Sequence, residues 1–291
     1  MVKLNYSRQR PPRHLSLYSQ AVLLCSGIYS TLGWVFVGFG MILFWVFTYN
    51  STAMLWLSPN VDWENGQGII IKIENTNASE KEENIYSLTY NYFANGQKYT
   101  GKGYMIDDDL MEGDEVAIQF NPKNVLHSRL TNGRQKMFST WAIFAVIFPL
   151  IGLGMLFYGI KANYKALKLI KIGHFSTGQV LSKEPTGGNV SINEINYPIY
   201  KYEFQFFVKG SARIAKCQTY KAHLVEDEVE EFILYDYVEP NINAVYDAIT
   251  NAPELDSLGQ MKQVSFKKYY LLIAPILTLL IHIPWAYFVL T

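Results

Sequence analysis

Three long apolar stretches without Asp, Glu, Lys or Arg most restrict how this chain folds. They are residues 21–47, 141–160 and 269–291. A helix needs about 20 apolar residues to cross the hydrocarbon core of a bilayer, and each stretch is long enough. The first is too long for the apolar region of a signal peptide, and no A-x-A-like site follows it. We therefore expect three transmembrane helices, at residues 20–48, 139–160 and 269–291.

Lys and Arg residues near the ends of the spans indicate their orientation, because cytoplasmic flanks carry the excess of positive charge. Eleven such residues would share one side: Lys3, Arg8, Arg10, Arg13, Lys161, Lys165, Lys168, Lys171, Lys262, Lys267 and Lys268. Three basic residues near a span end would lie on the other side and weaken this assignment: Arg129, Arg134 and Lys136. We expect the N-terminal segment 1–19 and residues 161–268 in the cytoplasm, and residues 49–138 and the C-terminus outside.

Two alternatives to this topology stay open. Residues 14–48 could hold an interfacial helix (14–30) before a shorter crossing (32–48), which leaves the sides unchanged. A re-entrant hairpin would instead put both regions between the spans on the cytoplasmic side.

The four lysines Lys161, Lys165, Lys168 and Lys171 fall on about a third of a helix circumference. We expect a basic helical extension at 161–177. Its lysines either set the topology, which we favour, or contact lipid headgroups.

The two regions between the spans repeat one pattern. In YSLTYNYFANG (86–96) and YKYEFQFFVKG (200–210), apolar and polar residues alternate as in a strand, and a glycine turn follows. Each region reads as five short strands, in a first β unit (49–138) and a second (178–250), with a linker at 251–268. The polar stretches 75–84 and 185–196 read as loops.

This internal duplication predicts an α+β membrane protein with two small, barrel-like antiparallel β units. We expect Tyr86 to match Tyr200, Tyr90 to match Phe204, Gly96 to match Gly210 and Pro122 to match Pro240. The aromatic faces read as core, with a ligand-binding face as the alternative.

The segments GWVFVGFGMILFWVF, YSLTYNYFANG and GDEVAIQFNPKNVLHSRL, in that order, resemble the DUF3592 family of bacterial membrane proteins in its two-copy form. The second copy departs from the pattern, because HLVEDEVEE lacks the Gly-Asp pair. The resemblance implies the fold and a bacterial cytoplasmic (inner) membrane location, and no activity.

Two groups of acidic residues offer ligands for Ca²⁺, but neither has the ligand spacing of an EF-hand, so we expect solvated turns instead. They are Asp107, Asp108, Asp109, Glu112, Asp114 and Glu115, and Glu226, Asp227, Glu228, Glu230 and Glu231. We expect no metal and no cofactor.

His282 is the one histidine inside an apolar span, which makes it a candidate functional residue. A neutral imidazole bonded to Tyr, Ser or Thr of another helix is favoured. Pro275 and Pro284 should kink the third span. Five glycines would let helices pack closely: Gly33, Gly38, Gly40, Gly152 and Gly154.

No catalytic motif is readable, and a net charge of zero gives no basic field for nucleic acid. We expect a non-enzymatic scaffold or interaction protein of a membrane assembly, in contact with lipids and an unidentified protein partner. Homo-oligomerisation stays open. The alternative is a sensor or transport accessory protein that uses the third span around His282.

Overall fold

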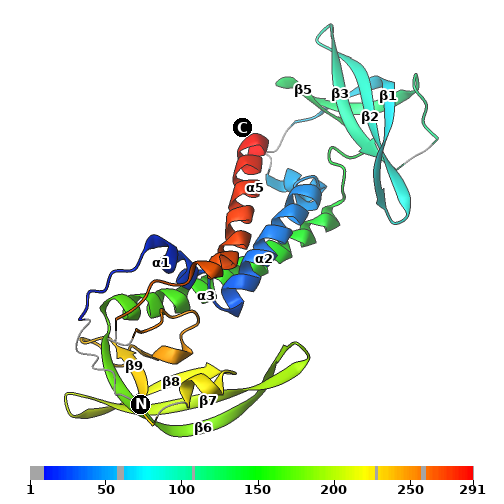
Figure 1. Ribbon diagram of the computed structural model, residues 1–291. Coiled ribbons are helices and arrows are strands. Elements are labelled where there is room, and N and C mark those ends of the chain that lie inside the picture. Colours follow the sequence, from blue (N-terminus) through cyan, green and yellow to red (C-terminus); the bar gives the residue numbers. More distant parts are fainter. Residues whose placement is uncertain (1–9, 58–61, 107–108, 227–228, 257–259, 291) are drawn as a thin grey trace. The chain divides into compact units, whose positions relative to one another are not determined.

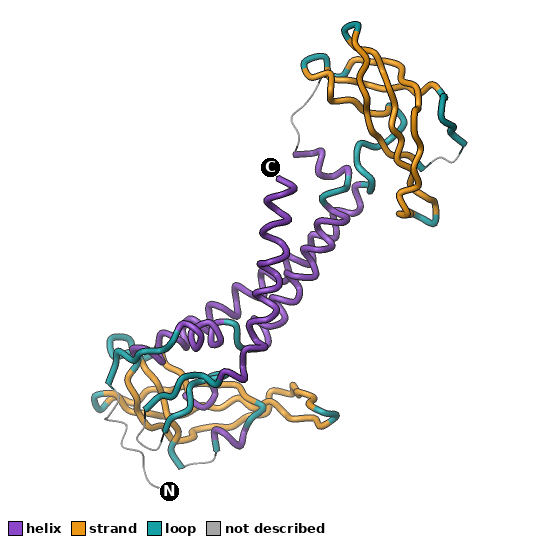
Figure 2. The backbone as a smooth tube through the Cα atoms, turned by 45° about the horizontal axis from the view of Figure 1, so that its top comes forward, coloured by secondary structure: helices purple, strands orange, loops and turns teal. Residues whose placement is uncertain are grey.

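The computed structural model describes residues 10–57, 62–106, 109–226, 229–256 and 260–290 (Figure 1). Six residues used above lie outside these ranges: Lys3, Arg8, Asp107, Asp108, Asp227 and Glu228. The chain is α+β, with helices and two antiparallel sheets (Figure 2). It divides into two compact units, residues 39–150 and residues 1–38 with 151–291, and each is described by itself.

Three helices are long and apolar enough to cross a membrane, as expected. They are Ile28–Thr48, Thr140–Ile172 and Phe266–Val289. Each joins an α-helix to a turn of another kind: α2 (Ile28–Leu43) continues as a π-helix, while 3₁₀ turns precede α3 (Ile147–Ile172) and α5 (Ile273–Leu290).

The first apolar run is not one helix. A separate helix, α1 (Leu17–Leu24), is capped at its start by the Ser16 side chain, which accepts from the backbone N–H of Ser19. The chain breaks before α2 at Gly27, whose φ of +82° favours glycine. This division follows the alternative of a short helix ahead of a shorter crossing.

The second span also differs in its bounds. Helix α3 runs on to Ile172, and the next strand begins at His174. The basic extension is therefore helical up to 172 rather than 177, and the second β unit begins before Gly178. Only Gly173 separates helix from strand, so the chain passes from α3 into the sheet without a linker.

The first β unit is a five-stranded antiparallel sheet in the order β3-β2-β1-β4-β5. Its strands are β1 (Glu64–Glu80), β2 (Glu83–Ala94), β3 (Gln97–Met105), β4 (Glu115–Asn121) and β5 (Asn124–Leu130). The central strand β1 pairs with both β2 and β4.

The second β unit has the order β10-β9-β6-β7-β8, which is the same order read from the other edge. Its strands are β6 (His174–Ile192), β7 (Ile195–Val208), β8 (Ser211–Thr219), β9 (Glu231–Tyr235) and β10 (Asn243–Val245). A short helix, α4 (Ala222–Val225), lies between β8 and β9.

Strand register supports the duplication in detail. Tyr86 pairs with Met105 as Tyr200 pairs with Thr219, so Tyr86 and Tyr200 occupy the same place. A register irregularity follows Ile70 in β1 and Val180 in β6, two residues after a glycine in each strand. The β2–β3 and β7–β8 turns are Asn95-Gly96 and Lys209-Gly210, and all four residues have positive φ. That is the backbone of a tight two-residue hairpin.

The aromatic faces of β2 and β7 form the cores of the two units, as predicted. Tyr90 and Tyr92 are 0% and 1% exposed, and Phe204 and Phe206 are both 0% exposed. In the first unit the tyrosines pack with Ile118, which pairs with Leu130 of β5. In the second unit the phenylalanines pack with Ile233, which pairs with Val245 of β10, so the two isoleucines occupy equivalent positions. A ligand cannot stack on faces that are buried in this way.

Two expectations about the β units were wrong. The polar stretches 75–84 and 185–196 are hairpins rather than loops, with turns at Lys81-Glu82 and Asn193-Glu194. The prolines do not match either. The pairing of Phe120 with Ser128 matches that of Tyr235 with Asn243, so Phe120 and Tyr235 are equivalent. Pro122 comes two residues after Phe120, whereas Pro240 comes five residues after Tyr235.

The edge strands β3 and β5 of the first unit approach each other over the core. The Tyr90 hydroxyl lies 3.0 Å from the Ser128 hydroxyl. A Cβ added at Gly101 would lie 2.3 Å from Ser128 Oγ and 2.5 Å from the Tyr90 ring. Only glycine fits at this point of β3 without a shift of buried groups.

We predict that Gly101→Ala destabilises the first β unit by about 1–3 kcal/mol, the usual cost of overpacking a core. The matched control is Thr100→Ala, at the neighbouring exposed position of β3. Thermal unfolding of the full chain in mild detergent, followed by near-UV circular dichroism, measures the difference. Equal stability of the two variants would contradict the close approach of β3 to β5.

Candidate functional site

The histidine inside the third candidate span lies where α5 crosses α2. His282 is 8% exposed, and its Nε2 lies 2.9 Å from the carbonyl oxygen of Gly38. A neutral imidazole that donates from Nε2 satisfies this contact, and its Nδ1, which is buried without a hydrogen-bond partner, is then a bare acceptor. The expected partner was a Tyr, Ser or Thr side chain, so the partner was wrong: His282 bonds the backbone.

Gly38 allows this contact because it brings the two helices together. A Cβ at this position would lie 2.7 Å from Oγ1 of Thr278, one helical turn before His282. Gly33 and Gly152 make similarly close approaches to Leu156 and Val37. These contacts confirm that glycines mediate close helix packing, as is common between membrane helices. Gly154 was wrongly included, since nothing lies within 4 Å of a Cβ there.

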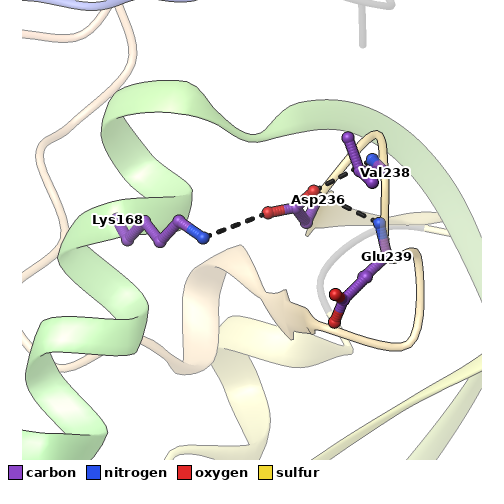
Figure 3. A network of polar contacts seen from close by, with 4 residues as sticks. All are labelled: Lys168, Asp236, Val238 and Glu239. Carbon is purple, nitrogen blue, oxygen red and sulfur yellow. Dashed lines mark hydrogen bonds and ion pairs between the residues drawn. The ribbon is translucent and has the colours of Figure 1, made fainter.

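One of the four α3 lysines is directed at the second β unit rather than away from the protein. Lys168 Nζ lies 3.4 Å from Oδ2 of Asp236, which follows β9 (Figure 3). The other carboxylate oxygen of Asp236 accepts from the backbone N–H groups of Val238 and Glu239, at 2.9 and 3.3 Å. Lys161 and Lys165 are exposed, while Lys171 is partly buried.

The Asp236 carboxylate is held in its charged form by these contacts. The two backbone donors, and then Lys168, keep its pKa below the usual range. The Asp236 side chain is 15% exposed. It therefore connects the C-terminal end of α3 to the loop between β9 and β10.

A second polar cluster lies at the base of the long β6–β7 hairpin. The buried Tyr202 hydroxyl donates to Glu226 Oε1 at 2.7 Å, and Lys183 Nζ lies 2.6 Å from the same oxygen. Burial and the neighbouring carboxylate raise the pKa of Tyr202 to about 12. These groups hold α4 and the loop after it against the hairpin.

Some described members of the two acidic groups stabilise local turns, and others bond residues distant in the sequence. Asp114 Oδ2 accepts from the backbone N–H of Met111 at 2.7 Å, and Glu230 Oε1 accepts from the Gln179 amide at 3.3 Å. Across the described residues, no three His, Cys, Asp or Glu side chains gather in a way that could hold a metal ion.

Sequence reasoning missed a cleft of about 1060 Å³ in the compact unit formed by residues 1–38 and 151–291. It lies between the start of α2, the β6–β7 hairpin, the end of β8 and the segment after β10. Its lining includes Ile28, Tyr29, Val190, Ile199, Gln218, Lys221, Leu224, Asp247, Asn251, Glu254 and Lys268. The lining combines apolar side chains with charges of both signs.

Asn163 was also missed, and it fixes one wall of this cleft. Its amide nitrogen donates to the carbonyl oxygens of Leu24 and Ser26, at 2.9 and 2.7 Å, and contacts the Ser30 hydroxyl. Asn163 thus satisfies the backbone where α1 ends and α2 begins. The sequence signal that could have indicated Asn163 is its position as an amide residue among the lysines of α3.

Comparison with known proteins gives no relative: no family model, curated protein or solved structure matches the chain.

We predict that Asp236→Asn lowers stability at neutral pH and that the difference disappears in acid. The folded pKa of Asp236 is depressed, so its contribution is present above the unfolded pKa, about 3.9, and is lost as pH falls through the folded pKa. Thermal unfolding of both proteins between pH 7 and strongly acidic pH tests this. Glu184→Gln, at an exposed carboxylate of β6, is a control for the loss of charge alone. A deficit that persists unchanged in acid would contradict the assignment.

Proposed function

We propose that the chain is a non-enzymatic integral membrane protein whose β units bind other proteins, as scaffold modules of a membrane assembly. The observation that carries this proposal is the projecting β6–β7 hairpin. Ile192 and Ile195 pair with each other at its tip and are 40% and 57% exposed. Exposed apolar side chains at the end of a strand pair are typical of a contact surface.

The backbone of the same hairpin supports this role. Strand β6 pairs with β9 only from His174 to Gly178, and along the remaining described residues no strand covers that side of β6. An open strand edge can accept a strand from a partner. Lys183 and Pro185 protect the beginning of this edge, so residues 189–192 are its most accessible part.

The proposed location is a bacterial cytoplasmic membrane, with the N-terminus in the cytoplasm. It is supported by the three candidate spans, by the distribution of Lys and Arg, and by the resemblance to the two-copy DUF3592 pattern. We further propose that each β unit closes as a small barrel. In the second unit this is supported by Asn243 of β10, whose amide donates to the carbonyl of Ile214 in β8 at 3.2 Å.

A sensor or transport accessory function is the second candidate. The buried Nδ1 of His282, without a hydrogen-bond partner inside a candidate span, favours it. A group of this kind in a bilayer is costly and commonly functional. In this alternative, α5 responds to a ligand. Pro284 in its interior removes a backbone hydrogen bond, so the helix can bend there.

We expect a stoichiometric partner to co-purify with the full chain in mild detergent and to be lost in Ile195→Asp. The charge would have to be buried in the contact, which is unfavourable without a counter-charge. Ile214→Asp, at a position 46% exposed in β8, is the matched control and should retain the partner.

His282→Leu separates the two functions in the same experiment. It should retain the partner if the hairpin binds it. Loss of the partner in His282→Leu together with its retention in Ile195→Asp would favour the sensor function. Repeated purification of the wild-type chain alone, without a partner or a second copy, would contradict the scaffold proposal.

We expect the two β units to face opposite sides of the membrane. Single cysteines replace Asn95 and Lys209, at the tips of equivalent turns, in a background without Cys25 and Cys217. A membrane-impermeant maleimide should label residue 95 in intact cells, and residue 209 only after the cells are broken. Equal protection of both cysteines would overturn this topology and favour the re-entrant alternative.

A further inference from the structure

The cleft in the compact unit of residues 1–38 and 151–291 lies at the ends of two candidate membrane spans. Ile28 and Tyr29 are the first residues of one span, and Lys268 is near the start of another. Ile28 and Tyr29 are 67% and 50% exposed, so their apolar side chains face outward where hydrocarbon gives way to water. Lipid is the most abundant ligand at this depth.

The polar part of the cleft carries both signs of charge. Lys221 and Lys268 form no ion pair with any described residue. Glu254 contributes an exposed carboxylate from the segment after β10, whereas Asp247 is already engaged within the protein. A ligand that carries an anion next to a cation would complement both signs of charge.

The segment after β10 is held in place, so the cleft exists before a ligand arrives. The Asn251 amide donates to Ser26 Oγ at 2.9 Å, and the Tyr246 hydroxyl donates to the carbonyl of Pro253 at 2.5 Å. Tyr246 is 3% exposed and belongs to the core of this region. A preformed site binds without the entropic cost of ordering its walls.

The dimensions and openness of the site are consistent with an amphiphile. A volume of about 1060 Å³ is at the upper end for a small-molecule site, large enough for a headgroup, a glycerol and the first carbons of acyl chains. The remainder of such chains would leave the cleft past Ile28 and Tyr29 into the bilayer.

We propose that this cleft binds a zwitterionic phospholipid, one whose headgroup carries a primary ammonium next to its phosphate. Lys221 and Lys268 bind the phosphate, Glu254 binds the ammonium, and the side chains of Ile28 and Tyr29 contact the start of the acyl chains. Ile192 and Ile195 at the tip of the β6–β7 hairpin do not line this cleft, although Val190 of the same hairpin does, and the lipid proposal does not rest on the proposed protein partner.

The test uses the full chain in nanodiscs with a phosphatidylethanolamine probe that carries a diazirine on the first carbons of one acyl chain. Irradiation followed by peptide mapping should place cross-links in residues 26–29, 218–221 or 246–255. Unlabelled phosphatidylethanolamine should compete at a roughly tenfold lower amount than phosphatidylglycerol, which lacks the ammonium.

Two kinds of variant test the assignment of residues. Lys221→Gln with Lys268→Gln should weaken probe binding roughly tenfold, while Lys98→Gln, an exposed lysine of the first β unit, should not change it. Gln218→Trp, at an exposed position of β8 on the cleft wall, should block binding by volume without disturbing a core. Near-UV circular dichroism confirms that each variant is folded.

Three results would overturn the proposal. They are cross-links confined to residues 30–48, 140–172 and 269–289, equal competition by the two lipids, and unchanged labelling in folded Lys221→Gln/Lys268→Gln and Gln218→Trp proteins.

Discussion

The last carbonyl groups of a helix have no partner within the helix, and the compact unit of residues 1–38 and 151–291 is built around the way α3 satisfies them. Arg13, which is 4% exposed, donates from its guanidinium to the carbonyl oxygens of Ile170 and Gly173, at 2.9 and 2.8 Å. The guanidinium also lies over the Phe175 ring at 4.8 Å. A cation at a helix C-terminus is favoured by the helix dipole as well as by these bonds. The N-terminal segment, the helix end and the first residues of β6 therefore meet at one side chain.

The sequence predicted the elements whose physical pattern is strong. Uncharged runs of sufficient length gave three spans, and strict alternation in β2 and β7 gave the buried aromatic faces. The ends of elements were less predictable. The break before α2 depends on a single positive φ at Gly27, which no periodicity reveals. The hairpin tip at 185–196 is exposed at most residues of β6, and the stretch 75–84 is polar on both faces, so neither shows the apolar–polar alternation that marks a half-buried strand.

The candidate sites were predictable only in part, for a related reason. His282 stands out as a polar residue in an apolar run, but its backbone partner at Gly38 carries no signal of its own. The cleft combines residues near positions 28, 190, 220, 250 and 268, so only the folded chain brings them together. The two β units have kept one topology, and their differences gather in the β6–β7 hairpin and the segment after β10. Duplication thus left one copy with additional surface that its core does not need.

The junction at Gly173 has a mechanical consequence. A helix and a strand joined by one residue, with Arg13 and the Lys168–Asp236 pair across the joint, turn together as a lever. Strand β6 has 19 residues, but it pairs with β9 only from His174 to Gly178 and with β7 from Gly178 onward, and register irregularities follow after Val180 and after Pro185. A tilt of α3 is therefore carried into the paired start of β6, and the irregularities are the points at which the rest of the hairpin can bend relative to it. If α3 spans a bilayer, as proposed, a change in bilayer thickness that tilts this span also reorients the sheet that it enters.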